Sequence, residues 1–311
     1  MTYFSADDEI PETARGAAIA LGNFDGVHLG HQAVLAAARA TASARGLPFA
    51  VAVFEPHPRR LFQPDAPPFR LQSPLQRARA LEAAGAVHVF EIRFDRALSL
   101  LSDVEFAEQI LAQRLGAAHV CVGAHFRFGR GRMGDAASLS VLGAGLAFSV
   151  DALPEIANAA GAKISSSAIR ETIAQGRLNE AASMLGRPWA IEGAVEHGFA
   201  RGRAMGFATA NLRLGEYQRP RLGIYAVRAN LGDGGVRDGV ASVGVNPTFA
   251  ALPEPLLEAH LFDFDADLYG CTIEVGLVAF LREEGRFENA EALARQIAED
   301  AAAARALLRG P

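Results

Sequence analysis

The first half of the chain alternates short apolar runs with segments that place apolar residues at helical spacing. The short runs predict strands, at residues 17–24, 47–54, 87–92 and 117–123. The helically spaced segments predict helices, at residues 29–44, 74–84, 103–115 and 166–185. Because the predicted strands are apolar throughout rather than alternating, they indicate a parallel sheet that helices cover on both faces.

The pattern changes after Gly186, where a Gly-Arg-Pro sequence is typical of the end of a helix. Four strands with only short turns between them are then predicted, at residues 223–231, 238–246, 256–264 and 272–281. Closely spaced strands without intervening helices indicate an antiparallel sheet or a small barrel. A last helix is predicted to begin near Asn289, because asparagine is a preferred helix cap, and to carry Leu293 and Ile297 on its apolar side.

The length of 311 residues fits two domains, which we place at residues 1–185 and 186–311. Half of the residues are hydrophobic, which is enough to fill two cores. A net charge of −5 argues against general binding of nucleic acids or of membrane surfaces. The two cysteines, Cys121 and Cys271, form no CxxC pair, which argues against a disulfide framework and against a cysteine-rich zinc site.

The chain carries no pattern of a targeting segment. No apolar run approaches the roughly 18 residues that a membrane span requires, and the acidic N-terminal segment lacks the features of a signal peptide. We therefore expect a cytoplasmic protein whose partners are small molecules, with no nucleic-acid or membrane partner. Weak self-association remains open.

The strongest candidate for chemistry is the segment LGNFDGVHLGHQ at residues 21–32, in which a strand leads through a glycine-containing turn into a helix. Gly22, Gly26 and Gly30 permit a tight backbone and close approach of a ligand. Free N–H groups at a helix start attract phosphate, and His28 and His31 add two imidazole donors there. The segment is neither a Walker A loop nor GxGxxG. The alternatives are two surface histidines whose hydrogen bonds are satisfied, or a zinc-binding pair with no third ligand nearby in the sequence.

A second candidate, KISSSAIR at residues 163–170, places three hydroxyl groups and two cations around another predicted helix start. Lys163, the only lysine in the chain, and Arg170 are positioned to bracket a polyphosphate. The three serines, Ser165, Ser166 and Ser167, are suited either to capping the helix or to binding phosphate beside its N–H groups. On its own this segment is weak evidence for a phosphate site, because helix capping by a serine explains half of the pattern.

In order and spacing, these two segments resemble the HxGH and ISSTxxR signatures of the HxGH nucleotidyltransferase superfamily. FEPHP at 54–58 and VGAHFRFGRGRMGD at 122–135 are similar to segments of the prokaryotic bifunctional riboflavin kinase/FAD synthetases. Three segments of the second half are similar to signatures of that family's kinase module: HGFARGRAMGFATANL at 197–212, SVGVNPTF at 242–249 and LEAHLFDFDADLYG at 257–270. The resemblance covers nearly the whole chain.

The resemblance implies a Rossmann-like α/β nucleotidyltransferase domain, which is an FMN adenylyltransferase, followed by a small antiparallel riboflavin kinase barrel with a C-terminal helix. The kinase would convert riboflavin to FMN with ATP, and the adenylyltransferase would convert FMN and a second ATP to FAD and pyrophosphate. Mg²⁺ would neutralise phosphate charge in both reactions. By the same resemblance His28 and His31 are catalytic. The implied ATP- and phosphate-binding residues are Gly22, Phe24, Asp25, Gly30, Lys163, Ser165, Ser166, Ser167, Arg170, Gly202, Arg203 and Gly206.

In the kinase half, hard oxygen ligands for Mg²⁺ are available from Thr209 and Asn211, beside a glycine-rich loop. Glu258 lies in a predicted strand with Phe262 and Phe264 on its face. By resemblance Glu258 is the general base that activates the ribityl 5′-hydroxyl of riboflavin. The alternative for Glu258 is an ordinary exposed strand glutamate.

Two positions depart from the family pattern. Ala208 replaces a proline before the metal ligands, and His125 stands where the family has Asp or Asn. A histidine there puts phosphate or metal handling in the adenylyltransferase half in doubt. Phe62, His125 and Phe128 are candidates for contacting the flavin, although core packing explains the two phenylalanines equally well.

Two alternatives to the bifunctional enzyme follow from these departures. The first is an active riboflavin kinase with an impaired adenylyltransferase half. The second is a non-catalytic, flavin-binding regulatory protein, against which the full set of catalytic residues argues.

Overall fold

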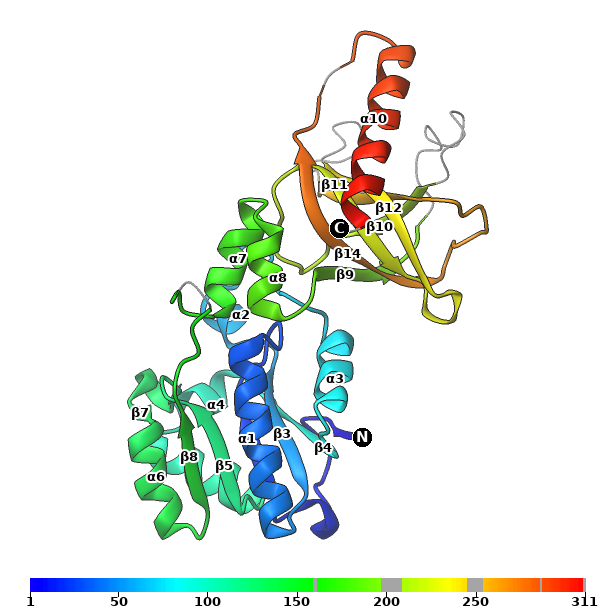
Figure 1. Ribbon diagram of the computed structural model, residues 1–311. Coiled ribbons are helices and arrows are strands. Elements are labelled where there is room, and N and C mark those ends of the chain that lie inside the picture. Colours follow the sequence, from blue (N-terminus) through cyan, green and yellow to red (C-terminus); the bar gives the residue numbers. More distant parts are fainter. Residues whose placement is uncertain (159–160, 197–208, 245–253, 286, 310–311) are drawn as a thin grey trace. The chain divides into compact units, whose positions relative to one another are not determined.

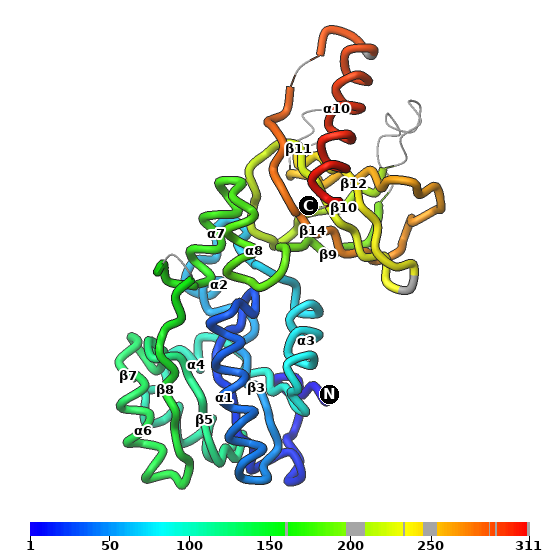
Figure 2. Tube along the Cα trace, viewed as in Figure 1, coloured from blue at the N-terminus to red at the C-terminus, as the bar shows by residue number. Residues whose placement is uncertain are grey.

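A computed structural model describes residues 1–158, 161–196, 209–244, 254–285 and 287–309 (Figures 1 and 2). The chain forms two compact units. The first comprises residues 1–67 and 74–164, and the second residues 68–73 and 165–311. Among the described residues, no helix is both long and apolar enough to cross a membrane.

The first unit is built on a six-stranded sheet whose strands are all parallel. In spatial order the strands are β1 (Thr2–Phe4), β4 (His88–Arg93), β3 (Phe49–Glu55), β2 (Ala18–Leu21), β5 (His119–Gly123) and β8 (Ser149–Leu153). The chain adds β3 and β4 on one side of β2, and β5 and β8 on the other. The strand order therefore reverses between β2 and β5, where α/β sheets commonly bind ligands at the carboxyl ends of the strands.

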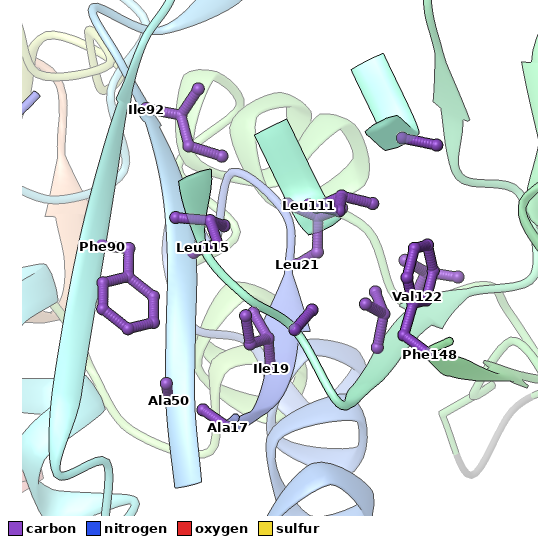
Figure 3. Packing of buried hydrophobic residues seen from close by; sticks show 14 of the residues in the cluster. Ala17, Ile19, Leu21, Ala50, Phe90, Ile92, Leu111, Leu115, Val122 and Phe148 are labelled. Atoms are coloured by element: carbon purple, nitrogen blue, oxygen red, sulfur yellow. The ribbon is translucent and has the colours of Figure 1, made fainter. Parts of the chain in front are cut away.

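Helices cover both faces of this sheet, as the apolar strands predict. Side chains of β2 alternate. Ile19 and Leu21 pack on one face with Leu111 and Leu115 (Figure 3). Ala18 and Ala20 pack on the other face. The second face is covered by helices α1 and α3. The helical elements of the unit are η1 (Glu12–Ala14), α1 (Leu29–Arg45), α2 (Pro58–Phe62), α3 (Pro74–Ala83), α4 (Arg96–Leu100), α5 (Asp103–Glu105), the π-helical η2 (Phe106–Arg114), η3 (Arg130–Arg132) and α6 (Ala136–Gly145). A short hairpin joins β6 (Arg127–Phe128) to β7 (Gly134–Asp135).

The second unit contains an antiparallel sheet with the predicted C-terminal helix. Its spatial order is β10 (Thr209–Arg213), β13 (Leu256–Leu261), β12 (Val236–Gly244), β11 (Gly223–Asn230), β14 (Thr272–Arg282) and β9 (Trp189–Ala194), with η4 (Gly232–Gly234) between β11 and β12. The backbone N–H of Glu196, just past β9, donates to the carbonyl of Asn211 in β10 at 2.9 Å. This contact links the two ends of the strand order, so the sheet forms a nearly closed barrel.

The last helix, α10 (Ala290–Leu308), begins where the sequence predicts. The side-chain oxygen of Asn289 accepts from the backbone N–H of Ala292 at 2.8 Å, which is a helix N-cap. Ala304 and Leu308 pack with Phe262 against the barrel strands.

Two predicted elements differ in the structure. The helix predicted at 166–185 is two helices, α7 (Ser166–Ala174) and α8 (Leu178–Leu185), because Gly176 adopts a φ of +76° between them. The strand predicted at 256–264 ends at Leu261, so Phe264 does not share a strand face with Glu258.

Candidate active sites

The start of α1 fixes the chemistry of His28. Its ring Nδ1 accepts a hydrogen bond from the backbone N–H of His31 at 3.2 Å, so His28 is the N-cap of the helix. An accepting Nδ1 carries no proton, which leaves Nε2–H as the donor of a neutral ring. The rings of His28 and His31 stack with centroids 3.6 Å apart. The predicted histidine pair is thus brought together at one helix terminus.

The geometry of the helix start explains why a glycine, Gly30, stands between the two histidines. A Cβ on Gly30 would lie 3.1 Å from Cε1 of the His28 ring, so a side chain there would require the ring to shift by a few tenths of an ångström. Phe24 and Val27 have φ values of +50° and +39°. Left-handed backbone is costly for such side chains and concentrates at functional sites. Asp25, also predicted here, is buried.

A pocket of about 600 Å³ lies beside this loop, within the first unit. Gly22 and Asn23 from the loop after β2 line one part of it. Its apolar lining consists largely of six phenylalanines, Phe54, Phe62, Phe94, Phe106, Phe126 and Phe128. Three arginines, Arg59, Arg127 and Arg132, together with His57, add polar groups. The volume and the mostly apolar lining with few polar groups are typical of a small-molecule site.

Two of the three predicted flavin contacts, Phe62 and Phe128, line this pocket, whereas His125 does not. Phe128 is 6% exposed and belongs to the core cluster, so it packs in the core as well as lining the pocket. Phe62 is 62% exposed, which is unusual for a phenylalanine. An exposed aromatic ring at the mouth of an apolar pocket is suited to stacking on a planar ligand.

His125 and Lys163 meet on a carboxylate that the sequence interpretation missed. The ring Nε2 of His125 lies 3.2 Å from Oε1 of Glu155, and the Lys163 ammonium pairs with the same oxygen. The ammonium, and less strongly the imidazole, hold the pKa of the Glu155 carboxyl below its usual range. These two side chains, His125 and Lys163, therefore share one partner.

The remaining residues of the second predicted phosphate segment belong to the other unit. Ser165 caps α7, because its hydroxyl accepts from the backbone N–H of Ala168 at 3.2 Å. Ser166 and Ser167 form the first turn of that helix. Arg170 donates through Nε to the carbonyl of Phe69 at 2.7 Å. Lys163 and Arg170, the two cations predicted to bind a polyphosphate between them, thus belong to different units.

In the barrel, β10 and β13 pair in such a way that the predicted kinase residues lie directly opposite one another. Asn211 pairs directly with Glu258, and Thr209 with His260. Side chains at opposed positions of an antiparallel pair lie on one face, so these four residues share it. The opposite face carries Leu257, Ala259 and Leu261, which are buried in the barrel. His260 is a member of this polar face that the sequence interpretation did not single out.

Asn211 offers a test of the predicted metal site. Its side chain is buried, and Oδ1 has no hydrogen-bond partner among the described residues. An orphaned buried oxygen needs a donor or a cation, and the Thr209 hydroxyl stands on the same face two residues before it. A hard cation such as Mg²⁺ prefers oxygen ligands of this type. The residues present fit the predicted ion.

Part of the predicted ATP site lies outside the described residues. Gly202, Arg203, Gly206 and Ala208 fall within residues 197–208, and most of the segment at 242–249 falls within 245–253. Their predicted roles remain predictions.

The sequence interpretation also missed most of the pocket lining. Phe54, Phe94 and Phe106 come from separate segments that only the sheet topology brings together. A usable signal existed for Phe126, which is two residues from Phe128 in the same HFRF segment.

Two protein families match the chain, one over each half. The family described as FAD synthetase matches residues 10–168, and the family described as riboflavin kinase matches residues 185–308.

Relatives match over nearly the full length. A bifunctional riboflavin kinase/FMN adenylyltransferase of Pseudomonas fluorescens is 41% identical, covering 94% of this chain and 93% of the relative. Proteins of the same description from Escherichia coli K12 and Bacillus subtilis are 40% and 36% identical, covering 93% and 94% of this chain and 92% of each relative. A solved structure described as a macrolide-efflux protein from Streptococcus pneumoniae superimposes with a TM-score of 0.85 at 29% identity, covering 96% of this chain and 97% of that one.

Proposed function

The chain belongs to the family of bifunctional riboflavin kinase/FMN adenylyltransferases, and on that premise we propose which of its residues carry each reaction. The enzyme phosphorylates riboflavin to FMN and transfers an adenylyl group from ATP to FMN, which gives FAD. We assign FMN adenylylation to residues 1–185 and riboflavin phosphorylation to residues 186–311.

For adenylylation, the proposal rests on the protonation state that the start of α1 gives to His28. A phosphate oxygen of FMN attacks the α-phosphorus of ATP, and the bond to the β-phosphate oxygen breaks as pyrophosphate leaves. Negative charge moves onto the leaving phosphate during this step. We propose that the Nε2–H of His28, the His31 ring and backbone N–H groups at the helix start donate to it. No covalent intermediate on the enzyme is required.

For flavin binding, we propose that the phenylalanine-lined pocket holds the isoalloxazine ring of FMN. The pocket shares Gly22 and Asn23 with the loop that leads to His28. A flavin seated there has a planar, mostly apolar surface that matches aromatic walls. Phe62 is the candidate for stacking, because its ring is otherwise exposed. Arg59, Arg127 and Arg132 supply donors for the polar edge and the phosphate.

For phosphorylation, we propose Glu258 as the general base and Asn211 and Thr209 as ligands of Mg²⁺. Glu258 takes the proton of the riboflavin 5′-hydroxyl as that oxygen attacks the γ-phosphorus of ATP and ADP leaves. Its position directly opposite Asn211 supports this assignment, because the base must lie near the phosphate that the metal holds. Mg²⁺, when bound, supplies electrostatic stabilisation of the transferring phosphoryl group.

The test is incubation of the pure protein with riboflavin, ATP and Mg²⁺, with the flavins resolved by chromatography over time. FMN should appear first and FAD should follow. FMN that accumulates without FAD would favour the kinase with an impaired adenylyltransferase half, and neither product would favour the regulatory flavin binder.

The alternative of an impaired adenylyltransferase depends on His125. The His125 ring already contacts Glu155, at 3.2 Å between Nε2 and Oε1. The variant His125→Asp should therefore change the rate of FMN adenylylation only modestly. A large gain would indicate that this chain is a weakened adenylyltransferase.

We also propose a reducing, cytoplasmic location for the enzyme. Both cysteines, Cys121 and Cys271, are unpaired thiols, which is the usual state of cysteine in the cytoplasm.

A further inference from the structure

A second chemically distinctive cluster lies in the first unit, on the sheet between β5 and β8. The register pairs His119 with Ser149 and Cys121 with Asp151, so the four side chains project from one face of two neighbouring strands. The His119 ring Nε2 lies 3.2 Å from the Cys121 sulfur and 3.4 Å from a carboxylate oxygen of Asp151. The three potential ligand atoms all lie within 4.8 Å of one another.

These separations match a shared metal ion. With bond lengths of about 2.0 Å from zinc to nitrogen or oxygen and about 2.3 Å to sulfur, ligand atoms around a tetrahedral ion are roughly 3.3–3.5 Å apart. The two measured separations, 3.2 and 3.4 Å, fall close to that range. Imidazole, thiolate and carboxylate are also the three ligand types that zinc accepts.

The surroundings of His119 supply the orienting contact that metal-bound histidines need. Its other ring nitrogen, Nδ1, lies 2.8 Å from the hydroxyl oxygen of Ser149. Arg45, the last residue of α1, donates to the same oxygen at 2.8 Å and so holds the serine in place. The tautomer that carries its proton on Nδ1, directed at Ser149, leaves the lone pair of Nε2 facing Cys121 and Asp151. A hydrogen bond to the second ring nitrogen is the usual way in which proteins orient a metal-ligating imidazole.

Burial and charge also favour an ion. His119 and Cys121 are 1% and 0% exposed, whereas the Asp151 side chain is 58% exposed and leaves one side open to solvent. One thiolate and one carboxylate would balance the charge of a divalent cation.

We propose that His119, Cys121 and Asp151 form a binding site for one Zn²⁺ ion, separate from both proposed active sites. The protein supplies three ligands, and the fourth position opens to solvent beside Asp151. Cys121 contributes as thiolate, and its proton is released to solvent when the ion binds. The ion ties the edge strand β8 to β5, and the site requires neither nucleotide nor flavin.

The experiment uses the full-length protein, stripped with a chelator and titrated with Co²⁺ alone and then with Zn²⁺. Cobalt bound by a thiolate gives a sulfur-to-metal charge-transfer band, which oxygen ligands of an active site do not give. The band should saturate at one Co²⁺ per chain and should disappear when Zn²⁺ is added. Absence of the band from the wild-type protein would overturn the proposal.

Variants identify the ligands. Cys271→Ser removes the chain's other cysteine and should leave the band intact, whereas Cys121→Val, which keeps an apolar side chain in the core, should abolish it. Asp151→Asn changes an exposed residue and should weaken binding about tenfold or more. Ser149→Ala should weaken it by roughly 10- to 100-fold, the usual effect of removing an orienting contact. Conversion of FMN to FAD, which we assign to residues 1–185, verifies that the first unit is folded in each variant.

Two patterns would contradict the assignment. A band that survives Cys121→Val and disappears with Cys271→Ser would place the metal at Cys271. Unchanged Co²⁺ affinity in both Asp151→Asn and Ser149→Ala would mean that the cluster is only a hydrogen-bonded group and not a metal site.

Discussion

At the scale of single residues, the proposed role of His28 depends on one backbone contact. A helix cap that accepts through Nδ1 determines which nitrogen keeps the proton. Gly30 favours this geometry, because a side chain there would require the His28 ring to shift. The spacing of the two histidines therefore has a local structural cause as well as a proposed catalytic role.

The variant His31→Ala tests that role. It removes a donor at the helix start, so the rate of FAD formation from FMN and ATP should fall about 10²- to 10³-fold, the usual effect of losing one preorganised charge-stabilising group. Riboflavin phosphorylation by the same preparation should be nearly unchanged and serves as the control. If FAD forms at the wild-type rate, the histidines are structural and the phosphate site is misassigned.

The variant Glu258→Gln makes the corresponding test in the barrel. Glutamine keeps the shape but cannot accept the proton, so FMN formation should fall by about 10²- to 10⁴-fold. Conversion of FMN to FAD should continue. Glu283→Gln is a matched control, because it removes an equally charged but exposed residue that pairs with Arg221. Equal losses in both variants would mean that charge alone, and not a base, is responsible.

At the scale of elements, the sequence predicted the strands and helix ends that short stretches of neighbouring residues determine. Apolar runs located β3, β4, β11 and β14, and the asparagine cap located the start of α10. The edge strand β8 was missed because most of its residues are only half-buried or exposed, so its sequence SVDAL has no continuous apolar run. The helical spacing of apolar residues continues through Gly176, which concealed the break between α7 and α8. The flavin pocket was unpredictable in detail, because its walls come from segments that only the sheet order brings together.

The attachment of α10 to the barrel depends on a charged pair that sequence patterns do not reveal. Arg282 of β14 donates through Nε and Nη2 to both carboxylate oxygens of Asp300, at 2.8 and 2.6 Å. Asp300 is buried, and Gln296 donates to it as well. Bidentate geometry and burial make this contact stronger than an ordinary surface ion pair.

We therefore expect Asp300→Asn to lower the free energy of unfolding of the barrel by about 1.5–3 kcal/mol, since hydrogen bonds to a charged group are lost. Urea titration followed by the fluorescence of Trp189, the only tryptophan of the chain and a residue of β9, measures it. Asp263→Asn also removes a bidentate partner of an arginine, Arg305 of α10, but that aspartate is exposed. It should lower stability much less than Asp300→Asn does, because solvent screens an exposed ion pair. Equal effects of the two variants would contradict the role of burial.

At the scale of the whole molecule, the compact units do not follow the boundary at residue 185 that the sequence suggests. Helices α7 and α8 group with the barrel, and so do residues 68–73. Trp189 Nε1 donates to the carbonyl of Leu71 at 2.7 Å, and Arg187 donates to the side chain of Gln72 at 3.1 Å. A segment from early in the chain therefore completes the unit that contains the proposed kinase residues.

This grouping predicts how the kinase half behaves when it is separated. A fragment of residues 186–311 retains every proposed kinase residue and should phosphorylate riboflavin without forming FAD. A fragment of residues 165–311 should do the same but unfold at higher urea concentration. Both lack residues 68–73, so they differ only in α7 and α8, and α8 packs on β9 and β14 with Leu178, Met184 and Leu185 buried. Removing that cover exposes apolar surface at about 25 cal/mol per Å², and Trp189 fluorescence reports the unfolding of both fragments. Equal stability would mean that the two helices contribute nothing to the barrel. Loss of phosphorylation in a folded 165–311 fragment would show that the kinase needs residues 68–73 or the first unit.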